Sequence, residues 1–389
     1  MYDIVVAGFI TSDIFPTFYP TKNGFRDVFV PGRLVNIGPI NITTGGAVAN
    51  TGLALLKLGI NTSLMGKIGD DDIGGIIKNV INQKFGFHDD SIVAKGCESA
   101  YTIAVEVPGV DRVLCTHSGV ADTFTPEDLD YEKIKGAKIF HYGYPTLNKL
   151  MYEDGGERMA AMYKKTRELG CVNSLDVTLP DPNSPSGKVD WKAILKKTLP
   201  YVDIFLPSVE ELIYMLDKER YDVLKAKDDD IIAQLTMDDL PKYGQMLLDL
   251  GVKIAGIKCG TKGFYVKTAG PDQIETLKAL SLNASDFGGK EVFSKIFKAK
   301  QVVSTTGAGD TSIAGFLAGL VRGYSLKKTI NTATGSGAMC VTQYGAVEGV
   351  PTLEQLDELI GTQLKKDKEP LSLNEWEYNE ADDLYYRKK

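Results

Sequence analysis

The chain has 389 residues, of which 43% are hydrophobic and 24% are charged, as is ordinary for a globular protein. Its formal net charge of −7 argues against nucleic acid as a partner, because a polyanionic backbone attracts basic surfaces. No apolar run approaches the ~18 residues that a membrane span needs. The five cysteines are widely spaced and only three histidines are present, so we expect neither a disulfide framework nor a His/Cys metal site, and a cytoplasmic location.

The N-terminal third predicts a strand, a helix and a second strand, followed by further elements. Residues 2–8 form an apolar, β-branched strand, and residues 48–59 have helical spacing that ends at Gly59. Residues 62–69 are typical of a strand, and residues 70–83 of a helix with an acidic first turn. Residues 100–108 and 111–117 alternate as two strands. Thr125 is expected to cap a helix whose first residue is Pro126.

The rest of the chain alternates more regularly between short apolar strands and amphipathic helices. The expected strands cover residues 137–143, 171–177, 201–207 and 252–260. The expected helices cover residues 156–170, 190–200, 208–216 and 238–251, with two more after residue 307 and near residues 326–345. This β-α alternation predicts an α/β fold with a mostly parallel sheet and helices on both faces.

Residues 1–365 are expected to form one domain, with several segments added to its β-α core. Residues 14–44 and 96–120 are extended and turn-rich, which suits a small β-sheet beside the main domain. Residues about 217–239 and 270–298 are predicted to be surface insertions, and residues 366–389 a charged, aromatic-rich tail.

The most informative stretch is residues 302–320, where a β-branched run passes through Thr-Thr-Gly-Ala-Gly-Asp into an apolar helix. The first N–H groups of a helix lack intrahelical partners, and small residues let an oxyanion approach them. Asp310 suits a general base that takes a proton from a hydroxyl attacking a bound phosphoryl group. The residues alone equally allow an Asp310 that only stabilises the helix N-terminus.

Two common nucleotide-binding motifs are missing. No G-x-x-x-x-G-K-[ST] sequence occurs, which excludes a P-loop NTPase. The residues after the first strand, GFITSD, are not G-x-G-x-x-G, which disfavours a dinucleotide-binding fold.

The segment from Ser304 to Asp310, followed by Ala-Gly-Phe-Leu at 314–317, resembles the C-terminal signature of the ribokinase-like (PfkB) carbohydrate kinases. An N-terminal signature is matched in part: Gly45-Gly46, Asn50, Gly59 and Gly69 hold the family spacing, whereas Val48 and Gly52 depart from the usual residues. The resemblance covers about residues 2–355. It implies a three-layer ribokinase-like sandwich with a small β-sheet lid.

The resemblance also implies roles for individual residues. Asp310 matches the catalytic base, and the backbone of Gly307, Ala308 and Gly309 matches the anion hole. Acceptor-binding positions are Asp13, Gly45, Gly46 and Asn50. ATP-binding positions are Gly260, Thr306 and Ser208. Glu211, in Ser-Val-Glu-Glu where the family has N-x-x-E, would help to hold Mg²⁺, largely through water.

The implied reaction is magnesium-dependent transfer of the ATP γ-phosphoryl group to a hydroxyl of a sugar or sugar-like molecule, with a homodimer formed through the lids. Many relatives carry Asp near a monovalent-cation loop where this chain has Ser304, so potassium activation stays open. His117 and His141 are further candidates for substrate contact, against ordinary hydrogen-bonded histidines.

Two other functions stay open. A nucleoside kinase of the same fold would favour an aromatic lid, which Phe9, Phe15, Phe18 and Tyr19 allow. A non-catalytic sugar-binding or regulatory protein would not need Asp310. The acceptor itself is not identified, although a sugar phosphate would need a basic lid residue, for which Arg26, Arg33 and Arg112 are candidates.

Overall fold

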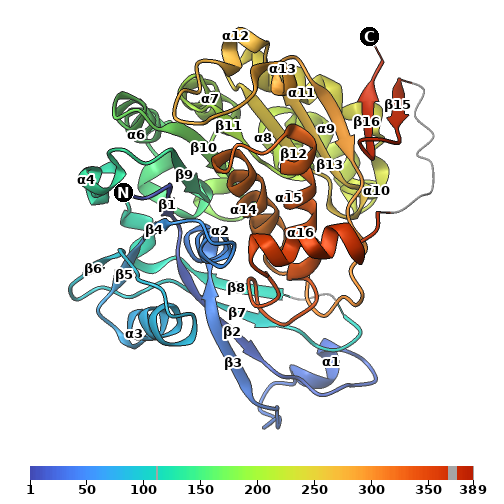
Figure 1. The fold of residues 1–389 in the computed structure, drawn as a ribbon. Coiled ribbons are helices and arrows are strands. Elements are labelled where there is room, and N and C mark those ends of the chain that lie inside the picture. The colour runs from blue at the N-terminus through green and yellow to red at the C-terminus, as the bar shows by residue number, and fades with distance from the viewer. Residues whose placement is uncertain (111–112, 367–374, 389) are drawn as a thin grey trace.

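The computed structural model describes residues 1–110, 113–366 and 375–388, and its centre is a ten-stranded sheet (Figure 1). Six adjacent strands pair in parallel, in the order β4 (Thr62–Met65), β1 (Ile4–Gly8), β9 (Ile139–Gly143), β10 (Val172–Asp176), β11 (Ile204–Phe205) and β12 (Ile254–Lys258). Four antiparallel strands extend the β12 edge, in the order β13 (Phe264–Thr268), β14 (Glu291–Ser294), β16 (Leu384–Arg387) and β15 (Trp376–Asn379). The expected mostly parallel α/β sheet is confirmed.

The sheet is buried on both faces, which explains why its parallel strands are apolar at almost every position. In β1, Ile4 and Val6 join one hydrophobic core, whereas Val5 and Ala7 join the other. The first core is covered by α2 (Gly46–Lys57), α3 (Asp72–Asn79), α12 (Pro271–Ile274), α13 (Ala284–Phe287), α14 (Ala308–Val321), α15 (Leu326–Cys340) and α16 (Leu353–Thr362).

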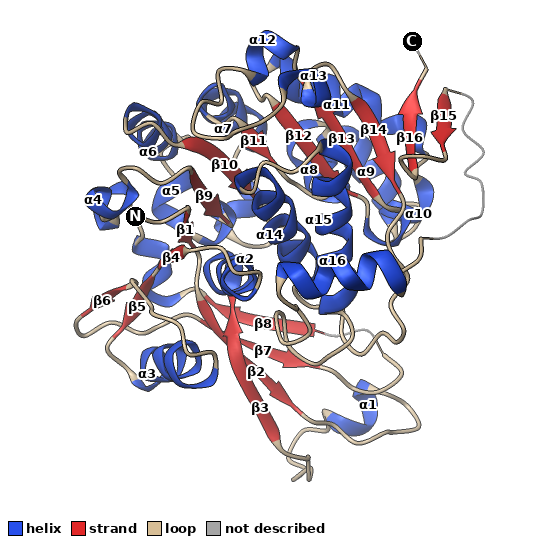
Figure 2. Ribbon diagram, in the orientation of Figure 1, coloured by secondary structure: helices blue, strands red, loops and turns tan. Residues whose placement is uncertain are grey.

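The second core lies on the opposite face, behind the sheet in Figure 2. Its helices are α4 (Tyr131–Ile134), α5 (Lys149–Tyr152), α6 (Glu157–Glu168), α7 (Trp191–Thr198), α8 (Val209–Leu216), α9 (Lys218–Lys225), α10 (Ile231–Gln234) and α11 (Leu240–Asp249). Two helical layers therefore enclose one sheet. None of the helices in the described part of the chain combines the length and apolar character required to cross a bilayer.

A smaller four-stranded sheet projects from the main body at the bottom of Figure 1. Its order is β3 (Ile40–Gly45), β2 (Thr11–Pro16), β7 (Tyr101–Val105) and β8 (Val113–His117), with α1 (Phe25–Val28) in the connection between β2 and β3. These strands overlap the two segments expected to form the lid, 14–44 and 96–120, although β2 begins earlier, at Thr11, and β3 ends at Gly45; we call this sheet the lid sheet. Residues 111 and 112, where the strand before His117 was expected to begin, lie outside the described residues.

The structure differs from the sequence-based expectation in the antiparallel half of the sheet. Residues 270–298, expected to be a surface insertion, include β14, whose Val292, Phe293 and Ser294 are buried. Instead of a separate tail, residues 376–387 form the hairpin β15–β16 against β14. Both errors have one cause: a four-residue strand carries too little periodicity to identify its sheet partner from the sequence.

Two smaller differences concern residues 62–69 and 217–239. The single strand expected at 62–69 is divided at Gly66 into β4, in the main sheet, and β5 (Lys67–Gly69), which pairs with β6 (Ile92–Ala94). The expected insertion at 217–239 folds as α9 and α10 and buries Tyr221 and Ile231 in the second core. Its charged side chains cover an amphipathic segment rather than a loose loop.

Candidate active site

The turn before α14 has the geometry of an anion cradle. Gly307 is the N-cap of the helix with φ 77°, a conformation that glycine adopts without strain. A Cβ built on Gly307 would lie only 2.5 Å from the Ala346 Cβ, so both space and conformation require glycine. The backbone N–H groups of the first turn lack intrahelical partners and carry the positive end of the helix dipole.

Asp310 lies in the first turn of α14 and is only 4% exposed. Its Oδ2 accepts a hydrogen bond from Asn50 Nδ2 at 2.9 Å, and its Oδ1 accepts one from the Tyr144 hydroxyl at 2.8 Å. Burial raises the pKa of Asp310, although Lys258 and these two donors oppose the rise. Both carboxylate oxygens are thereby oriented by donors that stabilise the ionised form.

Tyr144 was not identified from the sequence. It follows β9 in a left-handed conformation, φ 62°, which is uncommon for a residue other than glycine. Its backbone N–H donates to the Asp176 carbonyl at 3.2 Å, and its hydroxyl donates to Asp310. Strain of this kind concentrates at functional sites, where the surrounding structure holds the residue in place.

Asp176 and Lys258 were also missed, and they lie at the carboxyl ends of β10 and β12. Lys258 Nζ lies 2.9 Å from Asp176 Oδ1, and the carboxylate is fully buried. Burial raises the pKa of Asp176 to about 8, although Lys258 opposes the rise. Burial alone would lower the pKa of Lys258, but Asp176, Glu211 and Asp310 outweigh it and raise the pKa. The signal that could have found them is position, since ligands bind at the carboxyl ends of parallel strands.

Ser208 and Glu211 form a capping box at the start of α8. The Ser208 N–H donates to Glu211 Oε2 at 2.6 Å, and the Glu211 N–H donates to Ser208 Oγ at 3.3 Å. Burial raises the pKa of Glu211, and Lys258 opposes the rise. Among the residues that the structure describes, no group of three or more His, Cys, Asp or Glu side chains is arranged to hold a metal directly.

The structure brings together the residues predicted to bind the acceptor. Asp13 lies on β2 directly against Gly45, such that a Cβ built on Gly45 would overlap the Asp13 carboxylate. Gly46 begins α2 with φ 79° and approaches Phe9, where a Cβ would lie 2.5 Å from the Phe9 carbonyl oxygen. One turn further along α2, Asn50 reaches Asp310. The N-terminal part of α2 thus connects the lid sheet to α14.

A cavity of about 580 Å³ lies beside the first turns of α14. Gly260, Ala308 and Gly309 line it, as do Lys258 and a set of mostly apolar side chains: Phe264, Ile296, Phe297, Val302, Ala338 and Val341. Its apolar walls suit a planar ring, and the α14 N-terminus lies at one side. Gly260 is the one of the three predicted ATP-binding residues that lines this cavity.

Thr306 and Ser208 do not line this cavity. The Thr306 N–H donates to Ser304 Oγ at 3.3 Å, within the turn that leads into Gly307. Ser208 holds Glu211 through the capping box described above. Ser208 forms an isolated β-bridge with Lys258, and Thr306 follows Thr305, so each is next to a residue that lines the cavity.

The histidine and arginine candidates are dispersed. His117 lies on the exposed strand β8, with its ring 5.4 Å from that of Tyr101. His141 is fully buried in β9, where its Nδ1 lies 2.9 Å from Ser174 Oγ. Arg26 and Arg33 are exposed, and Arg112 lies outside the described residues.

Comparison with known proteins gives a family and several relatives. The family model described as "pfkB family carbohydrate kinase" matches residues 17–353. An uncharacterized sugar kinase of Archaeoglobus fulgidus is 26% identical over 299 residues, covering 77% of this chain and 98% of that protein. Probable fructokinase-6, chloroplastic, of Arabidopsis thaliana is 26% identical over 352 residues, covering 88% of this chain and 79% of that protein.

Solved structures share the fold. The Arabidopsis thaliana ribokinase complexed with ribose and ATP has a TM-score of 0.68 at 20% identity, covering 92% of this chain and 98% of the other. The adenosine kinase from Sinorhizobium meliloti has a TM-score of 0.65 at 19% identity, covering 92% and 99%. These likenesses establish the ribokinase-like fold that the motif resemblance predicted.

Proposed function

Because the chain belongs to the pfkB family of carbohydrate kinases, we propose that it phosphorylates a hydroxyl of a sugar or sugar-like acceptor with Asp310 as the general base. The observation that carries this assignment is the place of Asp310. It lies buried in the first turn of α14, directly after Ala308 and Gly309, which line the cavity, and it is hydrogen-bonded to Asn50 of the predicted acceptor group. A donor on one side and an acceptor on the other would meet at this carboxylate.

In the proposed reaction, the acceptor oxygen forms a bond to the γ-phosphorus of ATP. The bond from that phosphorus to the oxygen bridging the β- and γ-phosphates breaks, and ADP leaves. The hydroxyl proton passes to Asp310, whose ionised form Asn50 and Tyr144 favour through their hydrogen bonds. The backbone N–H groups of the turn at 307–309 stabilise negative charge on the transferring phosphoryl group.

We assign acceptor binding to Asp13, Gly45, Gly46 and Asn50. The contacts of Asp13 with Gly45 and of Asn50 with Asp310 support this assignment. The Asp13 carboxylate would accept hydrogen bonds from acceptor hydroxyls, and the glycines leave the room beside it. The adenine of ATP is assigned to the cavity beside Gly260, with Thr306 and Ser208 shaping the adjoining backbone. Closure of the lid sheet over the acceptor would exclude water and limit hydrolysis of ATP.

Magnesium is assigned to Glu211, with Asp176 as a second carboxylate. Mg²⁺ prefers oxygen ligands and keeps several waters. Asp176 Oδ2 is buried without a hydrogen-bond partner among the described residues, which suits this role. When bound, the ion supplies charge neutralisation on the donor phosphates.

The test is ADP release with Mg-ATP across sugars, sugar acids, sugar phosphates and nucleosides, in KCl and in NaCl. We expect turnover with one acceptor class, and Asp310→Asn should lower kcat by ~10²–10⁴-fold because the base is lost. The control is Asp190→Asn, at the cap of α7, where asparagine caps a helix as well as aspartate. Undiminished turnover in Asp310→Asn would refute the assignment of Asp310 as the general base. An acceptor that raises Tm without ADP release in either protein would instead indicate a binding protein.

A further inference from the structure

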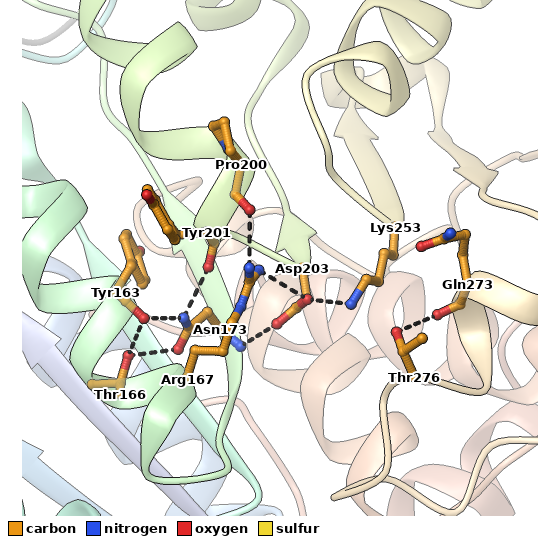
Figure 3. A network of polar contacts seen from close by, with 10 residues as sticks. All are labelled: Tyr163, Thr166, Arg167, Asn173, Pro200, Tyr201, Asp203, Lys253, Gln273 and Thr276. Carbon is orange, nitrogen blue, oxygen red and sulfur yellow. Dashed lines mark hydrogen bonds and ion pairs between the residues drawn. The ribbon is translucent and has the colours of Figure 1, made fainter.

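Two partly buried Lys–Asp ion pairs lie at opposite ends of the parallel strands, and they differ in how fully the aspartate oxygens are hydrogen-bonded. Lys253 and Asp203 precede β12 and β11, and Figure 3 shows their network. Asp203 Oδ1 accepts from Lys253 Nζ at 2.8 Å and from Arg167 at 3.4 Å, while its Oδ2 accepts from the Asn173 N–H at 2.9 Å. Both oxygens are satisfied, as expected for a pair that only stabilises the fold.

The pair at the carboxyl ends is incomplete. Lys258 reaches from β12 across the end of β11 to Asp176 on β10, and its Nζ bonds Oδ1 at 2.9 Å. No described residue bonds Asp176 Oδ2, although this atom is buried. Leaving such an oxygen unpaired costs stability, so a structural role alone accounts poorly for this arrangement.

Lys258 also faces the nucleotide cavity. Its side chain is 13% exposed and lines the cavity together with Gly309. A Cβ built on Gly309 would lie 3.7 Å from Lys258 Nζ, so the ammonium lies beside the first turn of α14. A cation and a helix N-terminus therefore converge at one side of the cavity, an arrangement suited to phosphate.

The charged groups around the Lys258 ammonium also favour phosphate binding. Asp176 Oδ1 lies 2.9 Å from the ammonium, and Asp176, Glu211 and Asp310 all raise the pKa of Lys258, so the lysine is held in its charged form. A triphosphate brought to this site adds further negative charge. A side-chain cation within reach would offset part of this charge, and lysine offers a point charge on a flexible stem.

We propose that the Lys258 ammonium binds the terminal phosphates of the donor nucleotide. This inference rests on the proposed function, because it uses the cavity beside Gly260 as the donor site. On binding, the ammonium keeps Asp176 on one side and donates to phosphate oxygen on the other. It adds a side-chain cation to the backbone N–H groups of the turn at 307–309.

The test is calorimetric titration of ATP and of AMP in EDTA, where no transfer occurs. Lys258→Met should weaken ATP binding at least tenfold and leave AMP binding unchanged, since AMP lacks the terminal phosphates. The matched control is Lys253→Met, which removes the partly buried lysine of the other ion pair, directly before the same strand. It should lower Tm without changing the affinity for either nucleotide.

A double variant separates phosphate binding from simple charge neutralisation. Lys258→Met/Asp176→Asn removes both charges, so its Tm should recover relative to Lys258→Met while ATP binding stays weak. Recovery of wild-type ATP affinity in the double variant, or undiminished affinity in Lys258→Met, would overturn the proposal. The outcome is independent of the base assignment, because Asp310→Asn tests turnover whereas Lys258→Met is judged by ATP binding alone.

Discussion

Gly45 leaves free the space beside Asp13, the carboxylate proposed to bind the acceptor. Gly45 ends β3 and caps α2 with φ −138°, an extended conformation that any residue adopts. Its role is therefore spatial, because a side chain there would overlap the carboxylate of Asp13. The same reasoning separates Gly45 from Gly46, whose φ of 79° adds a conformational requirement.

We predict that Gly45→Ala folds normally but binds the acceptor poorly. The added methyl group displaces the Asp13 carboxylate, so KM for the acceptor should rise about tenfold, the value of roughly one hydrogen bond to a charged group. KM for ATP should change little. Steady-state kinetics with each substrate varied in turn measures both. Gly75→Ala, on α3 with open space around the added methyl, is the control. An unchanged acceptor KM would remove Asp13 from the acceptor site.

At the scale of elements, the C-terminal hairpin extends the sheet that the rest of the chain builds. Trp376 on β15 is 4% exposed and packs its ring against Tyr265 and Phe293, at centroid distances of 6.1 and 6.4 Å. β16 pairs with β14 and covers an edge that would otherwise be open. The hairpin therefore completes the antiparallel half of the molecule.

We predict that Trp376→Ala lowers the free energy of unfolding by about 3–5 kcal/mol, as for other buried aromatic truncations. Trp376→Phe should cost less than half as much. It keeps a ring and removes an indole N–H that is buried without a partner among the described residues. Urea denaturation measures both variants. Glu377→Ala, exposed on the same strand, should change stability little. Equal losses in the Ala and Phe variants would contradict this packing account.

At the scale of the whole molecule, stability should depend on pH through the buried groups around the site. Burial, with a smaller contribution from Lys258, lowers the pKa of His141 to about 3. The unfolded state, with a pKa of about 6.5, then binds more protons below that pH, so stability is lost as pH falls from about 6.5 towards 3. Asp176, Glu211 and Asp310, whose pKa values are raised, act in the opposite direction.

We predict that between pH 7 and pH 5 His141 alone destabilises the fold by about 2 kcal/mol. His141→Asn should remove this dependence while keeping a polar group near Ser174. The difference between wild type and variant isolates the histidine, because both proteins share the carboxylates. Urea denaturation at both pH values measures it, with exposed His88→Asn as the control. Parallel pH profiles for wild type and His141→Asn would refute the prediction.

The exposed surface of the lid sheet is relevant to the predicted homodimer. Strand β8, at one edge of the lid sheet, is exposed along its length, and large apolar side chains are exposed on and before β3 at the opposite edge, including Leu34 at 91% and Ile40 at 56% exposure. Such a surface suits a homodimer formed through the lids, because an isolated sheet leaves edges unpaired. The homodimer stays a prediction, as do potassium activation and the cytoplasmic location.

What the sequence by itself determined was local and periodic. The β-α alternation predicted the parallel sheet, and Gly-Ala-Gly-Asp before an apolar run predicted a cradle at a helix N-terminus, because caps and periodicity act over a few residues. Tertiary structure decided which distant groups meet. Asp310 joins Asn50 across 260 residues and Tyr144 across 166, and Lys258 joins Asp176 across 82. The antiparallel strands β14, β15 and β16 could not be predicted from the sequence for the same reason, because a short strand is defined by the partner that buries it.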